Sequence, residues 1–135
     1  EIMDWAEREG WQPGAGDAEP FHAADPQGFF RSADGDRSVA SLSVVRATPD
    51  VAFLGLYIVD PDLRGRGHGM SLWSQVMARF EGTTVGLDAV PEQVDTYTSS
   101  GFLPAYGNAR YAGVNLPSTD EEALDADLGP FADRV

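Results

Sequence analysis

Glycine and arginine residues gather in one short stretch of the chain, between an apolar run and a helical pattern. The stretch reads Arg64-Gly65-Arg66-Gly67-His68-Gly69-Met70. Glycines at the start of a helix let backbone N–H groups approach an anion, because no Cβ atom keeps it away, and the helix dipole adds partial positive charge. We therefore expect the N–H groups of residues 65–70 to bind phosphate, with the charges of Arg64 and Arg66 beside them.

Two regular elements must position this loop. Residues 53–59 form a β-rich apolar run of the length expected for a strand that is buried on both faces, and Asp60-Pro61 ends it. After the loop, apolar residues recur at helical spacing, and Gly82 stands where a helix C-cap belongs. These residues are Trp73, Val76, Met77 and Phe80. The sequence therefore predicts a strand, a glycine loop and a helix in succession.

Other glycine motifs give competing interpretations. A P-loop requires Gly-Lys-Ser/Thr, and the chain contains no lysine, so this motif is excluded. A dinucleotide-binding fingerprint requires a third glycine at the position where this chain has Met70. The fingerprint also begins directly after a strand, whereas five residues separate Val59 from Gly65 in this chain. Asp88, at the end of the next apolar run, keeps that alternative open. A glycine loop that only makes a turn is the third interpretation.

Two local patterns resemble those of the GNAT acetyltransferases. The first is Arg-x-x-Gly-x-Gly from Arg64 to Gly69 after Val-Asp-Pro, and the second is Tyr97-x-x-x-Gly101-Phe102. The resemblance implies that the loop N–H groups hold the pyrophosphate of acetyl-CoA as co-substrate, and that Tyr97 gives a proton to the departing CoA thiolate. It also implies that the strand backbone pairs with the pantetheine arm. By position these strand residues are Tyr57, Ile58 and Val59.

The remaining elements follow from turn signals and periodicity. We expect helices at residues 2–9, 19–24 and 91–101, and strands at residues 29–32, 38–47, 83–87, 102–106 and 109–114. Asp34-Gly35-Asp36 predicts a hairpin, and β-helix-β order makes strand 83–87 parallel to the central strand. The fold class is mixed α/β: a GNAT-like, mostly antiparallel sheet flanked by helices, with a parallel strand pair at the cofactor cleft.

The domain organisation is also an expectation from sequence. The pattern Trp5-Ala6-x-x-Glu9-Gly10-Trp11-x-Pro13-Gly14 resembles the opening of a GNAT subgroup whose acetyltransferase domain precedes a smaller second domain. We expect a GNAT-like domain at residues 1–114, with the family's first strand missing ahead of Glu1. Residues 115–135 carry six carboxylates and one arginine, so we expect an acidic tail or linker there.

Direct attack of a primary amine on the thioester is the simplest reaction for such a site. An alkylamine with a pKa of about 10.4 is protonated at pH 7, and removing that proton costs roughly 4 to 5 kcal/mol, so a base is needed. The candidates are Asp88, which could instead cap a helix, and Glu19, which could instead be a surface charge. Tyr97 could instead be a core aromatic residue. Backbone N–H groups near residues 56–58 could polarise the thioester oxygen.

Composition limits the classes of partner. The net charge of −13 argues against duplex DNA and anionic membranes, and it favours cationic acceptors, either small molecules or peptides. The chain has no cysteine and only two histidines, so we expect no metal. We expect a cytoplasmic N-acetyltransferase, since the sequence shows no signal peptide. A homodimer and a further C-terminal domain stay open as partners. A CoA-binding regulatory module without turnover is the alternative function.

Overall fold

A computed structural model describes residues 2–11, 14, 16 and 18–108 of the 135-residue chain. Contacts divide the chain into two units at Pro104, and the elements below belong to the first. The helices are α1 (Ile2–Arg8), α2 (Ala18–Ala24), α3 (His68–Met77) and α4 (Val94–Ser99), with 3-10 turns at Pro61–Leu63, Ala78–Phe80 and Pro91–Gln93. The strands are β1 (Phe29–Asp34), β2 (Arg37–Thr48), β3 (Val51–Val59) and β4 (Thr84–Leu87).

The four strands form one sheet in the order β1-β2-β3-β4. β1, β2 and β3 are antiparallel neighbours, and β4 runs parallel to β3 after the chain has passed through α3. Gly35 has a φ of +59° between β1 and β2, which a hairpin turn requires and glycine adopts without strain. The predicted meander, the parallel pair and the mixed α/β class are therefore confirmed.

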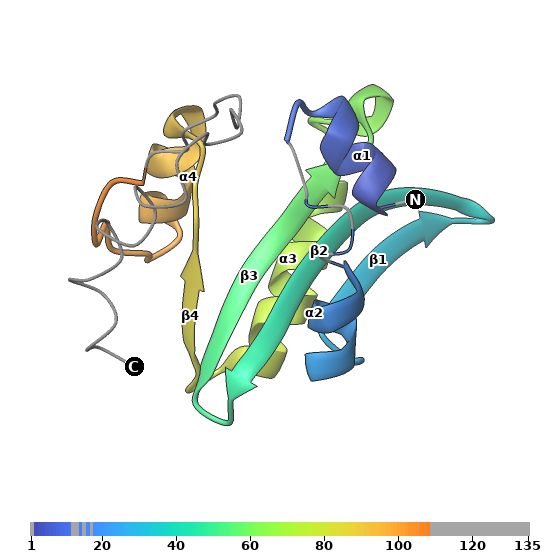
Figure 1. The fold of residues 1–135 in the computed structure, drawn as a ribbon. Helices are drawn as coiled ribbons and strands as arrows, with labels where there is room; N and C mark the ends of the chain where they lie inside the picture. The colour runs from blue at the N-terminus through green and yellow to red at the C-terminus, as the bar shows by residue number, and fades with distance from the viewer. Residues whose placement is uncertain (1, 12–13, 15, 17, 109–135) are drawn as a thin grey trace, which may run out of the picture. The chain divides into compact units, whose positions relative to one another are not determined.

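Helices cover both faces of the sheet (Figure 1), with α1 and α2 in front and α3 behind. The core lies between α3 and the sheet, where Leu72, Val76 and Phe80 pack against Leu42 and Leu54. Burial of one such side chain contributes about 1.5 to 3 kcal/mol. The predicted stripe is correct for Val76 and Phe80, whereas Trp73 and Met77 lie at the edge of the core and are only half-buried.

An extra residue interrupts the ladder between β2 and β3. Ser41 lies opposite Ile58 and Ser43 opposite Gly55, so two residues of β3 face one residue of β2. Leu56 has a φ of +50°, which only a few per cent of non-glycine residues adopt. This β-bulge reverses the alternation of β3. Leu54 before it and Tyr57 after it both face α3, while Leu56 faces the α1 and α2 side.

Two expectations from sequence were wrong. The central strand is not buried on both faces, because Phe53 is 44% exposed at the end of β3 that no helix covers in front (Figure 1). Residues 102–106 form no strand. Pro104 lacks an N–H group for a ladder, and the segment belongs to no ladder of the described sheet. The strand expected at residues 109–114, the domain boundary expected at 114 and the acidic tail lie outside the described residues.

Candidate functional site

The glycine loop presents backbone N–H groups without acceptors at the start of α3. The first hydrogen bond of this helix joins Ser71 N to Gly67 O at 2.9 Å. Within the described part of the chain, the N–H groups of residues 65–70 meet no backbone or side-chain acceptor. A Cβ atom added at Gly65 or Gly67 would meet no atom within 4 Å, so the space over these groups is open. The loop therefore fits a phosphate group.

Gly69 in the same loop has no room for a side chain, whereas Gly65 and Gly67 face open space. A Cβ atom at this position would lie 2.7 Å from Tyr57 Oη and 2.7 Å from Val59 Cγ2. The close approach lets α3 begin directly against β3. His68 beside it is half-buried, and Met70 is exposed, so both residues can offer their N–H groups without their side chains.

The two arginines of the loop differ in their contacts. Arg64 forms an ion pair with Glu9, just after α1, and donates from Nε to Val59 O at 3.1 Å. Its guanidinium therefore ties the loop to α1 and to the end of β3. Arg66 is exposed, and its side chain has no ion pair or hydrogen bond with any described residue. Of the two predicted charges, Arg66 is the one that can meet an anion.

The edge of β3 beside the loop lacks a strand partner. The ladder with β4 ends at the pair Leu54 and Leu87, and the two strands then diverge (Figure 1). Asp60 N donates to Val39 O at 2.9 Å, which makes Ala40 and Val59 a non-hydrogen-bonded pair. The N–H and C=O groups of Val59 therefore point away from β2, toward the open edge.

The neighbouring residues of β3 contribute in other ways. By the same alternation, Ile58 directs its backbone groups to β2, so it offers none to a ligand at the open edge. Ser41 Oγ donates to Leu56 O at 2.9 Å, which holds the bulge in place from β2.

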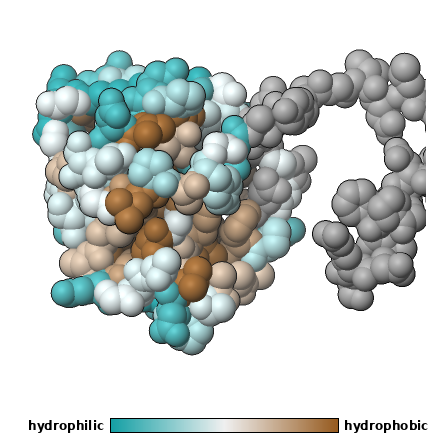
Figure 2. All heavy atoms as spheres, turned by 90° about the vertical axis from the view of Figure 1, so that its left-hand side faces the viewer, coloured by the Kyte–Doolittle hydropathy of each residue, from teal (hydrophilic) through white to brown (hydrophobic). Residues whose placement is uncertain are grey.

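Exposed apolar side chains follow β4, at Val90 and Val94. Figure 2 shows apolar side chains gathered in the middle of the face that carries β4 and α4.

Tyr97 belongs to a cluster of four aromatic rings from three elements and the segment after α4. The ring centre of Trp73 lies 5.4 Å from Tyr57, 5.9 Å from Tyr97 and 6.0 Å from Phe102. Burial raises the pKa of Tyr97 above the ordinary tyrosine value. Burial also raises the pKa of Tyr57, and the nearby Tyr97 adds to that rise. Both hydroxyls are therefore protonated at neutral pH, as a proton donor must be.

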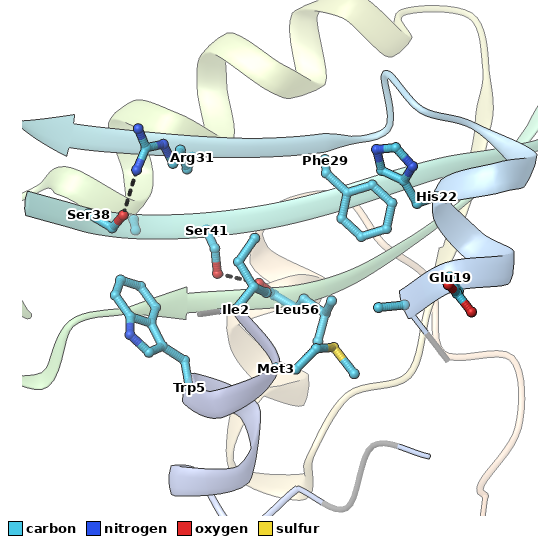
Figure 3. A pocket seen from close by; sticks show the side chains of 12 residues that line it. Ile2, Met3, Trp5, Glu19, His22, Phe29, Arg31, Ser38, Ser41 and Leu56 are labelled. Atoms are coloured by element: carbon cyan, nitrogen blue, oxygen red, sulfur yellow. Dashed lines mark hydrogen bonds between the residues drawn. The ribbon is translucent and has the colours of Figure 1, made fainter. Parts of the chain in front are cut away.

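A cavity of about 580 Å³ lies on the opposite face of the sheet, under α1 and α2 (Figure 3). It is lined by Ile2, Met3, Trp5, Ala18, Glu19, His22, Phe29, Arg31, Ser38, Ala40, Ser41 and Leu56. Leu56, in the bulge of β3, is one of these lining residues (Figure 3). The structure thus places Glu19 in the cavity. Asp88 is exposed beyond the end of β4 and does not line it.

Sequence reasoning missed most of the cavity. Arg31 and Ser41 lie on strands that were predicted, but nothing in their types indicates that their side chains line a cavity. His22 was visible as one of two histidines, and its spacing from Glu19 on the predicted short helix is the one signal that places both on a common face.

Other classes of site and protein find no support in the described residues. No group of three or more histidine, aspartate or glutamate residues in the described ranges could hold a metal ion. Nor does any described helix have the length and apolarity to cross a membrane. The described sheet has three antiparallel strands, unlike the doubly wound parallel sheet of a dinucleotide-binding domain, so that alternative is not supported.

Comparisons with known proteins agree with this geometry. A holothin acyltransferase from Pseudoalteromonas sp. (strain SANK 73390) is 37% identical over 119 residues, and this chain spans 40% of its length. A solved structure from Xanthomonas campestris pv. campestris, described as belonging to the GNAT family, is 27% identical with a TM-score of 0.53, over 62% of this chain and 63% of that one. Ard1 from Thermoplasma volcanium, 18% identical over 78% of each chain, shares the fold with a TM-score of 0.65.

A family model gives the assignment directly, because it covers most of the chain. Residues 1–102 match the model of the acetyltransferase (GNAT) family. This range contains the open edge of β3, the glycine loop and Tyr97. The chain therefore belongs to the GNAT acetyltransferase family.

Proposed function

We propose that the protein transfers an acetyl group from acetyl-CoA to a primary amine by direct attack. One observation carries the proposal: the unpaired edge of β3 runs from the bulge at Leu56 to the free N–H groups of residues 65–70. A long thioester with a diphosphate at one end fits such an edge. Its diphosphate would lie on the loop beside Arg66, and its amide-containing arm would accept from the Val59 N–H group, since Val59 O already accepts from Arg64 Nε at 3.1 Å.

The chemistry assigns a role to groups on both sides of β3. The amine nitrogen attacks the carbonyl carbon of the thioester, the new C–N bond forms, and the C–S bond breaks. Tyr97 gives its phenolic proton to the departing sulfur, and the proton lost by the amine goes to a base. Glu19 is the better of the two predicted bases, because it lines the same cavity as Leu56 of β3, whereas Asp88 does not.

The curated relative supports acyl transfer as the reaction class, since it is named a holothin acyltransferase. The acceptor substrate is proposed from the residues of this chain and not from the relative, because the chain spans only 40% of the relative's length. The net charge of −13 supports an amine that arrives protonated, since an acidic protein attracts cations.

Binding and turnover test the two halves of the proposal separately. Calorimetry should show acetyl-CoA binding, and release of free CoA thiol should depend on an added amine. Gly67→Ala should weaken acetyl-CoA binding at least tenfold, about 1.4 kcal/mol, because its Cβ enters the open space over the loop. Gly35→Ala is the matched control, since Gly35 also has positive φ and open space but lies in the β1–β2 hairpin.

The outcomes distinguish the alternatives. Equal affinity in folded Gly67→Ala and Gly35→Ala proteins would show that the loop does not hold the diphosphate. Tight binding of acetyl-CoA without thiol release for any amine would favour the regulatory module that binds CoA without turnover.

A further inference from the structure

We propose that the acceptor is a small primary amine with a flat apolar body, held in the cavity under α1 and α2. This inference rests on the proposed N-acetyl transfer and adds the substrate class. Leu56 in the bulge of β3 lines this cavity, so the cavity reaches the strand proposed to carry the thioester, and its volume of about 580 Å³ is within the usual range for small-molecule sites.

The walls of this cavity are mainly apolar. Ile2, Met3 and Trp5 approach from α1, Phe29 from β1 and Leu56 from the bulge (Figure 3). Two of these residues are aromatic, and they lie on opposite sides of the space. A ring between such walls gains apolar burial and stacking, whereas a hydrated polar chain would lose its water without replacement.

The serines of the cavity are already hydrogen-bonded. Ser38 Oγ accepts from Arg31 at 2.9 Å, and Ser41 Oγ donates to Leu56 O at 2.9 Å. The remaining charged groups lie at opposite ends, with Glu19 beside His22 at one end and Arg31 at the other (Figure 3).

This distribution of charge selects against polycations. Among the described residues that line the cavity, Glu19 is the single carboxylate, and the Arg31 guanidinium repels a second positive charge at the far end. The acidity of the protein as a whole attracts cations, whereas the described walls of the cavity combine one carboxylate with one arginine. Polyamines and basic peptides therefore fit it less well than an amine with one charge and an apolar body.

A panel of amines tests the inference on the wild-type protein. Phenethylamine and tryptamine should have kcat/KM values at least tenfold above those of ethylamine, putrescine and spermidine, measured as release of CoA thiol with acetyl-CoA. Higher values for putrescine, spermidine or a lysine peptide would overturn the inference and leave the proposed N-acetyl transfer intact. No turnover with any amine would instead overturn the proposed function.

Variants of two phenylalanines locate the site. Phe29→Ala should reduce the ratio of phenethylamine to ethylamine kcat/KM at least fivefold. Phe53→Ala should leave that ratio unchanged, because Phe53 lies on β3 of the same sheet but does not line the cavity. If Phe29→Ala does not fold, Phe29→Leu keeps apolar volume without the ring and should reduce the ratio to a smaller extent. An unchanged ratio in a folded Phe29 variant would contradict the assignment.

Discussion

The close approach of α3 to β3 gives a quantitative prediction at Gly69. The Cβ atom of Gly69→Ala would lie 2.7 Å from both Tyr57 Oη and Val59 Cγ2, whereas non-bonded atoms are at their optimum at about 3.5 to 4.0 Å. The backbone of Gly69 has no positive φ, so the cost of the substitution comes from these two contacts and not from backbone strain.

The expected magnitude is a balance of two effects. Overpacking of a close contact costs about 1 to 3 kcal/mol, and alanine recovers up to about 1 kcal/mol because it favours helix more than glycine does. Val59 is fixed within β3, and the Tyr57 ring is held by Trp73 at 5.4 Å, so neither neighbour can move freely. We expect Gly69→Ala to lower the free energy of unfolding by about 1 kcal/mol or more.

Urea unfolding followed by circular dichroism measures this difference directly. Gly86→Ala is the matched control, because its Cβ would meet Phe53 at an ordinary distance of 4.0 Å and should leave stability unchanged or higher. Adding Tyr57→Phe to Gly69→Ala removes one of the two contacts and should recover part of the loss. A Gly69→Ala protein as stable as wild type would refute the reasoning, since it would mean that the helix can begin farther from the strand.

Three further predictions concern the loop and its supports. Tyr97→Phe should lower kcat tenfold or more, about 1.4 kcal/mol, and leave the affinity for acetyl-CoA nearly unchanged, because the proposed proton transfer takes place in the transition state. If this variant turns over at the wild-type rate when chemistry limits the rate, the role of Tyr97 is structural. Arg66→Gln should weaken acetyl-CoA binding without a loss of stability in thermal unfolding, whereas Arg64→Gln should lower stability because it breaks the contact between loop and α1. Asp60 accepts a hydrogen bond from Arg37 at 2.7 Å, and this contact lowers the pKa of Asp60. The contact therefore stabilises the fold above the ordinary aspartate pKa, and this stabilisation is lost as the pH falls through the lowered pKa of Asp60. Asp60→Asn should therefore be less stable than wild type in urea at neutral pH and equal to it in strong acid, and an equal deficit at both pH values would exclude this ion pair as the cause.

Patterns that repeat along the chain predicted most of the fold. The hairpin at Gly35, the helix after the loop and its parallel strand all follow from turn chemistry and periodicity, which are local properties. The exposure of Phe53 could not be predicted in this way, because it depends on how far α1 and α2 extend over the sheet. The missing strand at residues 102–106 shows the same limit, since a strand needs a partner as well as a β-rich sequence.

Prediction of the site from sequence was limited in the same way, because it also relied on local patterns. The sequence identified the loop glycines without separating their roles, since only the structure shows that Gly67 leaves space for a ligand and Gly69 leaves space for Tyr57. It also treated Arg64 and Arg66 as equivalent charges. The contact with Glu9 joins residues 55 positions apart, and no spacing rule predicts it.

The bulge at Leu56 directs neighbouring side chains of one strand to opposite faces of the sheet, as the proposed use of β3 by both substrates requires. Without the extra residue, strict alternation would direct Leu56 toward α3 and Tyr57 toward the cavity under α1. With it, Tyr57 joins the aromatic cluster of Tyr97, and Leu56 enters the cavity. The chain tolerates a leucine at φ +50° here, although glycine would adopt that backbone without strain. A glycine would remove the apolar side chain that lines the cavity, so the unfavourable backbone at this position fits a role of Leu56 in the proposed acceptor site.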